Sequence, residues 1–201
     1  MKTFELKGSL RTDLGKKANK ALRKEEMVPC ELYGGGENVH FAISEKIFNK
    51  LLFTPEVYII DAEVDGKKFS CILRDVHFHA VTDKPLHADF YQVFEDKAFE
   101  VELPIRVEGF AKGIQAGGKL AVISRKLKVK GLMANLPENL LIEVSDLGLG
   151  RSIQVGELTY ENLELLNSKN SVVVQVKLTR AARAAAQSTS PDGSEVAEVA
   201  E

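Results

Sequence analysis

The fold is decided by one stretch, residues 57–81, which reads VYIIDAEVDGKKFSCILRDVHFHAV. Apolar residues alternate with polar ones through much of it, and this period is typical of a half-buried β-strand. Asp65-Gly66 interrupts the alternation with a dipeptide that two-residue hairpin turns favour, because it suits the right-handed twist of the flanking strands. The stretch therefore predicts two long antiparallel strands, over residues 57–64 and 67–81.

Shorter elements are predicted on both sides of this hairpin. Thr12-Asp13 and Ser44 offer side chains that can cap helices, and Pro55 prevents the second helix from continuing. The pattern predicts strands over residues 3–10, 28–33, 39–43 and 86–94, and helices over residues 14–26 and 45–52.

A second domain is predicted after the polar step at residues 95–97, where a strict alternation of apolar and charged residues begins. Its other expected strands span residues 120–130, 140–144 and 172–178. The last segment is rich in Ala, Ser and Glu and too poor in large apolar side chains to bury a core. We therefore expect domains over residues 1–94 and 95–180, a disordered acidic tail over 181–201, and a fold that is mainly β with short helices (α+β).

Charge is concentrated in the first predicted helix. The formal net charge is −2, yet the segment Lys7–Lys24 holds seven basic residues against a single acid. Helical spacing puts Lys16, Lys20 and Arg23 on one face, opposite a face formed by Leu14, Ala18, Ala21 and Leu22. Such a basic face can bind phosphates by releasing their counterions, although a merely solvated face is the commoner meaning of such a pattern.

Further hydrogen-bonding side chains accompany this basic face. They could probe the wide, shallow minor groove of RNA, which displays base edges and 2′-hydroxyls. Alternation along the strand predicts that Arg74 points away from His77 and His79, while His87 and Asp89 share a face of the next strand. The other candidates are Asn19 and Tyr33.

Catalytic and metal-binding alternatives have weaker patterns. A metal-dependent enzyme could use His77, His79, His87 and Asp89, but no HExxH or Cys cluster accompanies them. The segment 113–120 nearly matches a phosphate-binding loop, but Leu120 stands where a hydroxyl is needed, so we interpret it as a glycine turn. Cys30 and Cys71 are expected to be small buried residues. No cofactor, small-molecule substrate or membrane span is expected.

Two separated motifs stand out in the N-terminal half. The first is RTDLGKKANKALRKEEMVPCELYGG, residues 11–35, and the second is RDVxxHxVTDKPLHxDF, matched across residues 74–90. Together they resemble the two signatures of the Ctc family of general-stress and ribosomal proteins that bind 5S rRNA. The resemblance covers residues 1–180 and so implies the long, two-domain form.

The resemblance implies a small N-terminal β-barrel with helices that docks on the loop E region of 5S rRNA, followed by a β-rich C-terminal domain. It also implies a non-enzymatic, cytoplasmic protein whose partners are 5S rRNA, the large ribosomal subunit and neighbouring ribosomal proteins. A protein-binding stress adaptor working through residues 95–180 is the alternative. The positions similar to the family's RNA contacts are Arg11, Lys16, Asn19, Lys20, Arg23, Tyr33, Arg74, His77, His87 and Asp89.

Three positions depart from the usual family pattern. Lys20 stands where an arginine is usual, so it keeps the charge without the planar fork that grips phosphate. His77 replaces a usual glutamine and Ala80 a usual proline. His77 can still donate one hydrogen bond, with a protonation state that changes near neutral pH.

Overall fold

The computed structural model describes residues 2–179 and is mainly β, as the sequence predicts. The predicted tail over residues 181–201 lies outside the described residues. In chain order the elements are β1 (Lys2–Leu10), α1 (Lys16–Lys24), β2 (Met27–Tyr33), β3 (Val39–Ser44), α2 (Glu45–Leu52), β4 (Tyr58–Val64), β5 (Lys67–Phe78), β6 (Pro85–Gln92), β7 (Phe99–Glu108), α3 (Lys112–Gln115), β8 (Lys119–Val122), β9 (Lys126–Gly131), η1 (Met133–Asn135), β10 (Leu140–Glu143), β11 (Ser152–Gln154), η2 (Val155–Glu157), β12 (Glu164–Leu165) and β13 (Val172–Lys177).

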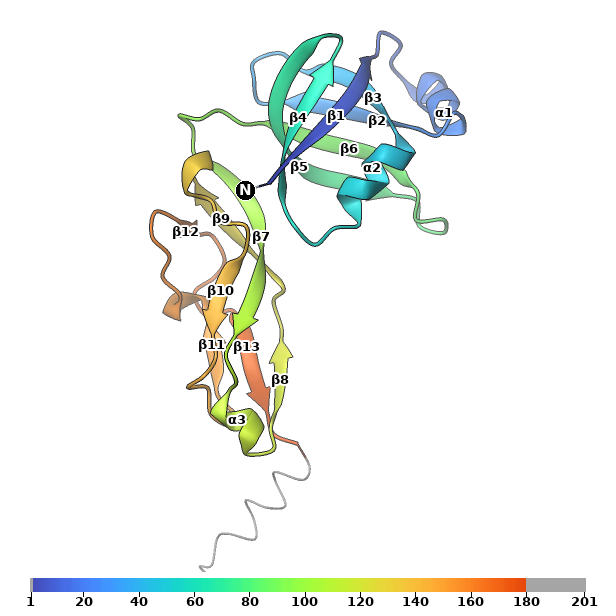
Figure 1. Ribbon diagram of the computed structural model, residues 1–201. Helices are drawn as coiled ribbons and strands as arrows, with labels where there is room; N and C mark the ends of the chain where they lie inside the picture. The colour runs from blue at the N-terminus through green and yellow to red at the C-terminus, as the bar shows by residue number, and fades with distance from the viewer. Residues whose placement is uncertain (1, 180–201) are drawn as a thin grey trace, which may run out of the picture. The chain divides into compact units, whose positions relative to one another are not determined.

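The first six strands form a closed barrel in the order β1-β3-β2-β6-β5-β4, with α1 and α2 outside the strands (Figure 1). The β4–β5 hairpin turns at Asp65-Gly66, both with positive φ, as the sequence predicts. Two parallel pairs complete the ring: β1 pairs with β4, and β2 pairs with β6. The implied small β-barrel is therefore confirmed.

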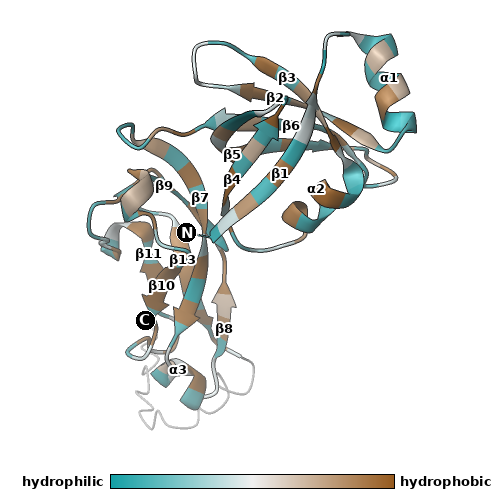
Figure 2. Cartoon of the chain, turned by 45° about the horizontal axis from the view of Figure 1, so that its top comes forward, coloured by the Kyte–Doolittle hydropathy of each residue, from teal (hydrophilic) through white to brown (hydrophobic). Residues whose placement is uncertain are grey.

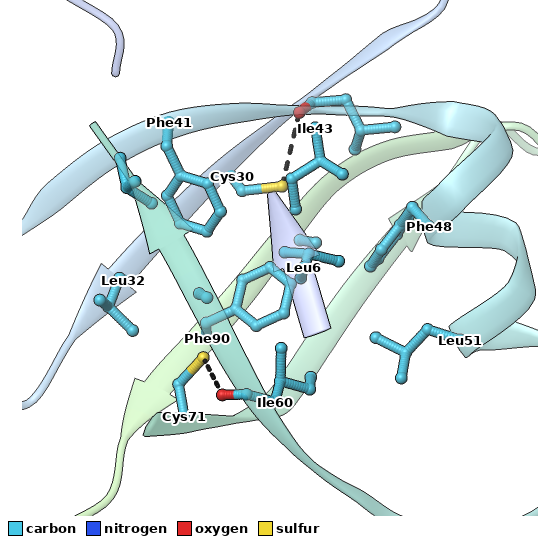
Figure 3. Packing of buried hydrophobic residues seen from close by; sticks show 14 residues of the cluster. Leu6, Cys30, Leu32, Phe41, Ile43, Phe48, Leu51, Ile60, Cys71 and Phe90 are labelled. Carbon is cyan, nitrogen blue, oxygen red and sulfur yellow. Dashed lines mark hydrogen bonds between the residues drawn. The ribbon is translucent and has the colours of Figure 1, made fainter. Parts of the chain in front are cut away.

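The barrel core is apolar and contains aromatic pairs. Phe90 is fully buried, with its ring centroid 5.5 Å from that of Phe41 and 6.2 Å from that of Phe48. Phe48 and Leu51 come from α2, so this helix contributes one apolar face to the core (Figure 3). Ser44 stands at the N-cap of α2, as predicted, but makes no side-chain capping hydrogen bond.

Cys30 and Cys71 are both fully buried in this core, as predicted. Each thiol lies 3.4 Å from a main-chain oxygen, that of Val28 and that of Ile60 respectively (Figure 3). Burial raises the pKa of Cys71 to about 12 and also raises the pKa of Cys30, because the thiolate is poorly solvated.

We expect neither cysteine to react with iodoacetamide at pH 8 in the folded protein, since the thiolate is the reactive form. The same protein unfolded in urea should be alkylated at both positions, as mass spectrometry would show. Rapid alkylation of either cysteine in the folded protein at pH 8 would contradict this expectation.

The raised pKa values of the two thiols also mean that unfolding releases thiol protons at high pH, so the barrel should lose stability as pH rises from about 9 to about 12.

The remaining strands form two further sheets, β10-β7-β9-β12 and β11-β13-β8. The strict alternation predicted from residue 101 onward is present in β7, along which hydrophobic and hydrophilic residues alternate (Figure 2). Its apolar residues up to Leu103 are buried, Ile105 and Val107 are half-buried, and its acidic residues are exposed. One prediction was wrong: residues 120–130 do not form a single strand. They form β8 and β9, which belong to different sheets. The break falls at residues 123–125, where the N–H groups of Ile123 and Ser124 both donate to the main-chain oxygen of Val173, so the regular ladder of β8 ends there. The implied β-rich C-terminal part is confirmed.

The described chain groups into two compact units. One contains the residues up to Ile105 together with Lys126–Leu140 and Tyr160–Asn167. The other contains Arg106–Arg125, Leu141–Thr159 and the chain from Ser168. The predicted domain boundary between residues 94 and 95 stays a prediction.

Candidate RNA-binding interface

Polar side chains form rows across three neighbouring strands of the barrel. Asp89 of β6 pairs with Asp75 of β5 on one side and with Glu31 of β2 on the other. Residues paired across a ladder point to the same face of the sheet. Asp75, Asp89 and Glu31 therefore form an acidic row, of which the sequence analysis had identified only Asp89.

A second row lies one step along the same face. His77 pairs directly with His87, with ring centroids 6.4 Å apart. His87 also approaches Asp89, with 2.8 Å between Nδ1 and Oδ1. At this distance an Nδ1–H group of the imidazole can donate a hydrogen bond to the carboxylate, so the two side chains hold one another in place. The predicted gathering of His77, His87 and Asp89 on adjoining strands is thus present.

Arg74 departs from the predicted alternation. The pairing of β5 with β6 shifts register between Leu73 and Asp75, so Arg74 has no partner in the ladder. Its guanidinium donates to the main-chain oxygen of Glu100 at 3.0 Å and approaches Oε2 of the same residue at 3.4 Å. A bulged residue interrupts the alternation of side chains between the two faces of a strand, and no pattern in the sequence predicts this bulge.

His79 also differs from its prediction. β5 ends at Phe78, and Nδ1 of His79 accepts hydrogen bonds from the main-chain N–H groups of Val81 and Thr82, each at 3.3 Å. His79 therefore shapes the turn between β5 and β6 instead of lying on a strand with His77. Within residues 2–179, no group of three or more His, Cys, Asp and Glu side chains is arranged to hold a metal ion.

Tyr33 at the end of β2 packs edge-on against Tyr91 of β6, with ring centroids 5.7 Å apart. A Cβ atom on Gly34 would lie 2.7 Å from the Tyr91 ring, and Gly34 has φ +102°, so glycine is required there. Partial burial raises the pKa of the Tyr33 hydroxyl, which remains a hydrogen-bond donor at neutral pH. The sequence patterns did not identify Tyr91, which supports the Tyr33 ring because the pairing of β2 with β6 places the two tyrosines side by side.

The basic helix is shorter than predicted. α1 begins at Lys16, and its N-cap is Gly15 with φ 108°, so Thr12 and Asp13 do not cap it. Leu14 precedes the helix and is 57% exposed, which means that it does not join the predicted apolar face. The helix packs against β2 on the outside of the barrel (Figure 1). The face bearing Lys16, Lys20 and Arg23 is exposed, as expected.

Two arginines attach α1 to the barrel. Arg23 donates from Nε and Nη2 to the main-chain oxygen of Leu86, at 3.0 and 2.8 Å. Arg11 donates from Nη2 to Oδ1 of Asn19, and its own N–H donates to the main-chain oxygen of His40 at 2.9 Å. Both arginines and Asn19 were predicted to contact RNA, and each already has a protein partner.

The comparisons with known proteins agree with this architecture. The Ribosomal L25p family matches residues 6–90, and the family called ribosomal protein TL5, C-terminal domain, matches residues 98–180. A closed barrel and a β-rich C-terminal part that match these two families in this order define a ribosomal protein of the long, two-domain form.

Relatives that match nearly the whole chain are each named large ribosomal subunit protein bL25. The relative from Phocaeicola vulgatus is 51% identical over 193 residues, which are 92% of this chain and 98% of the relative. Those from Bacteroides thetaiotaomicron and Porphyromonas gingivalis are 49% and 50% identical, with 92% of this chain and 97% and 98% of each relative covered.

The chain belongs to the bL25 family of large-ribosomal-subunit proteins. This confirms the resemblance to the Ctc-type long form. The family is structural and non-enzymatic, and as bacterial ribosomal proteins its members are cytoplasmic. Separately, no helix within residues 2–179 has the length and apolar character needed to cross a membrane.

Proposed function

We propose that this ribosomal protein binds the loop E region of 5S rRNA through the outer face of its N-terminal domain, residues 1–94. One contact supports this proposal most directly: the guanidinium of Arg23 fixes the lysine-rich helix α1 to the main-chain oxygen of Leu86, the residue before His87. One strand, β6, therefore joins a phosphate-binding helix to a face of hydrogen-bonding side chains. Both parts are needed to recognise a folded RNA.

The two parts of this surface act on different groups of the RNA. The ammonium groups of α1 are exposed and suit phosphates. The acidic row repels phosphates but accepts hydrogen bonds, and the donors available in an RNA minor groove are 2′-hydroxyls and guanine amino groups. The proposed interface is built from Arg11, Lys16, Asn19, Lys20, Arg23, Tyr33, Arg74, His77, His87 and Asp89. Arg11 and Arg23 belong to it through the hydrogen bonds by which they attach α1 to the barrel.

The test is a titration of the full-length protein against a loop E fragment of 5S rRNA and against an unrelated RNA hairpin of equal length. We expect tight binding to the loop E fragment, weaker binding to the control, and a linear fall of log K with log salt concentration for both. The preference for loop E should persist at higher salt, because base and groove contacts depend less on ionic strength. Equal, weak binding of both RNAs would favour the adaptor working through residues 95–180.

A further inference from the structure

α1 has few of the features that stabilise a helix by itself. It is nine residues long, buries no residue, lacks a side-chain cap and has no acid in its first turn. Its lysines at positions 16, 20 and 24 follow one another at a spacing of four, which brings like charges together on one face. Isolated helices of this length are marginal in water. The position of α1 therefore depends on its contacts with the barrel.

Besides the packing of α1 against β2, these contacts include the side-chain hydrogen bonds of the two arginines described above. Arg23, in the last turn, reaches the main-chain oxygen of Leu86 with two nitrogens. Arg11, anchored by its own N–H to β3, holds the side chain of Asn19 near the helix N-terminus. We infer that Arg11 and Arg23 are positioning residues, which fix α1 at both ends, and that the lysines of α1 make the phosphate contacts.

Arg23 and the lysines of α1 differ in whether they have hydrogen-bond partners within the protein. Within the described part of the chain, the ammonium groups of Lys16, Lys17, Lys20 and Lys24 make no hydrogen bond or ion pair. They remain available for phosphates. The Nε and Nη2 donors of Arg23, by contrast, are both directed at one carbonyl oxygen. A lysine at position 23 would keep the charge but could not reproduce this two-nitrogen contact.

The inference rests on the proposed function and deepens it. Leu86 directly precedes His87, so the Arg23 contact sets the distance between the lysines of α1 and the side chains of His87 and Asp89 on β6. If α1 is docked only one-tenth of the time without this contact, the apparent affinity for RNA falls about tenfold, because only the docked form is competent to bind.

The experiment compares Arg23→Lys with Lys20→Ala in the full-length protein. For Arg23→Lys we expect binding to the loop E fragment about tenfold weaker with an unchanged salt slope, and faster amide exchange within α1 in the RNA-free protein, measured by NMR. For Lys20→Ala we expect a salt slope smaller by about 0.9 and unchanged amide exchange. Asn19→Ala, which removes the acceptor of Arg11, should also speed exchange in α1, while the thermal midpoint of the barrel stays within a few degrees of wild type.

Wild-type affinity and wild-type amide exchange in Arg23→Lys would overturn the inference, since they would show that position 23 needs only a positive charge. A salt slope that falls by about 0.9 in Arg23→Ala but is restored in Arg23→Lys would overturn it as well, because that pattern identifies a phosphate contact. The amide exchange is measured without RNA. A failure of loop E recognition therefore cannot be mistaken for a failure of the positioning role.

Discussion

Replacing Phe90 with alanine should lower the free energy of unfolding of the barrel by about 3–5 kcal/mol, the range typical of a large buried aromatic side chain. Phe90 is fully buried between Phe41 and Phe48, so its removal leaves a cavity that the surrounding strands cannot readily fill. Whole domains are stabilised by only about 5–15 kcal/mol. Urea unfolding followed by tyrosine fluorescence would measure the loss.

The matched control is Phe53→Ala, which makes the same chemical change at a side chain that is 75% exposed. We expect this variant to change the free energy of unfolding by less than about 0.5 kcal/mol. Similar losses in the two variants would mean that burial in the Phe41–Phe90–Phe48 cluster is not what makes Phe90 important.

Replacing Lys16 and Lys20 together with alanine should weaken binding to the loop E fragment roughly 60-fold at 0.1 M salt. Each lost phosphate contact lowers the salt slope by about 0.9, so two contacts remove about 1.8 decades of affinity between 1 M and 0.1 M salt. Both side chains are exposed on α1, so the stability of the barrel should change little. Titrations at several salt concentrations would give the slope and the affinity together.

The double variant Lys67→Ala and Lys68→Ala provides the charge-matched control. Both residues are exposed at the β4–β5 turn, at the opposite end of β5 from His77. Net charge falls equally in the two double variants, and only the α1 variant removes proposed contacts. An equal loss of affinity in both would show that the protein attracts RNA through its overall charge and not through α1.

The β4–β5 hairpin and α2 could be predicted from the sequence because each is determined by residues that are neighbours along the chain. Asp65-Gly66 marks the turn between β4 and β5, and the apolar spacing of residues 45–52 gives α2 with the bounds that the structure shows. The barrel itself was expected only from the family resemblance. Its parallel pairings join residues far apart in sequence, and no periodicity encodes them.

The site was predicted less completely, for equally physical reasons. The basic face of α1 follows from spacing alone, and His77, His87 and Asp89 do gather on adjoining strands. The faces predicted for Arg74 and His79 from simple alternation were wrong. A bulge at Arg74 and the end of β5 at Phe78 interrupt the alternation of side chains along this strand. The acceptor of Arg23 is a main-chain oxygen, and every residue has one, so no residue type could have revealed it.

The parallel pairing of β1 with β4 also constrains how the protein folds as it is synthesised. Lys2 pairs with Tyr58, and β2 pairs with β6, which ends at Gln92. A nascent chain that has released only its first 50 residues therefore has an unpaired strand edge on β1, and the ring can close only after β6 has emerged. Such non-local pairings slow folding and leave strand edges open to aggregation. We expect the barrel to form late, in one cooperative step, once about 90 residues are free of the ribosome.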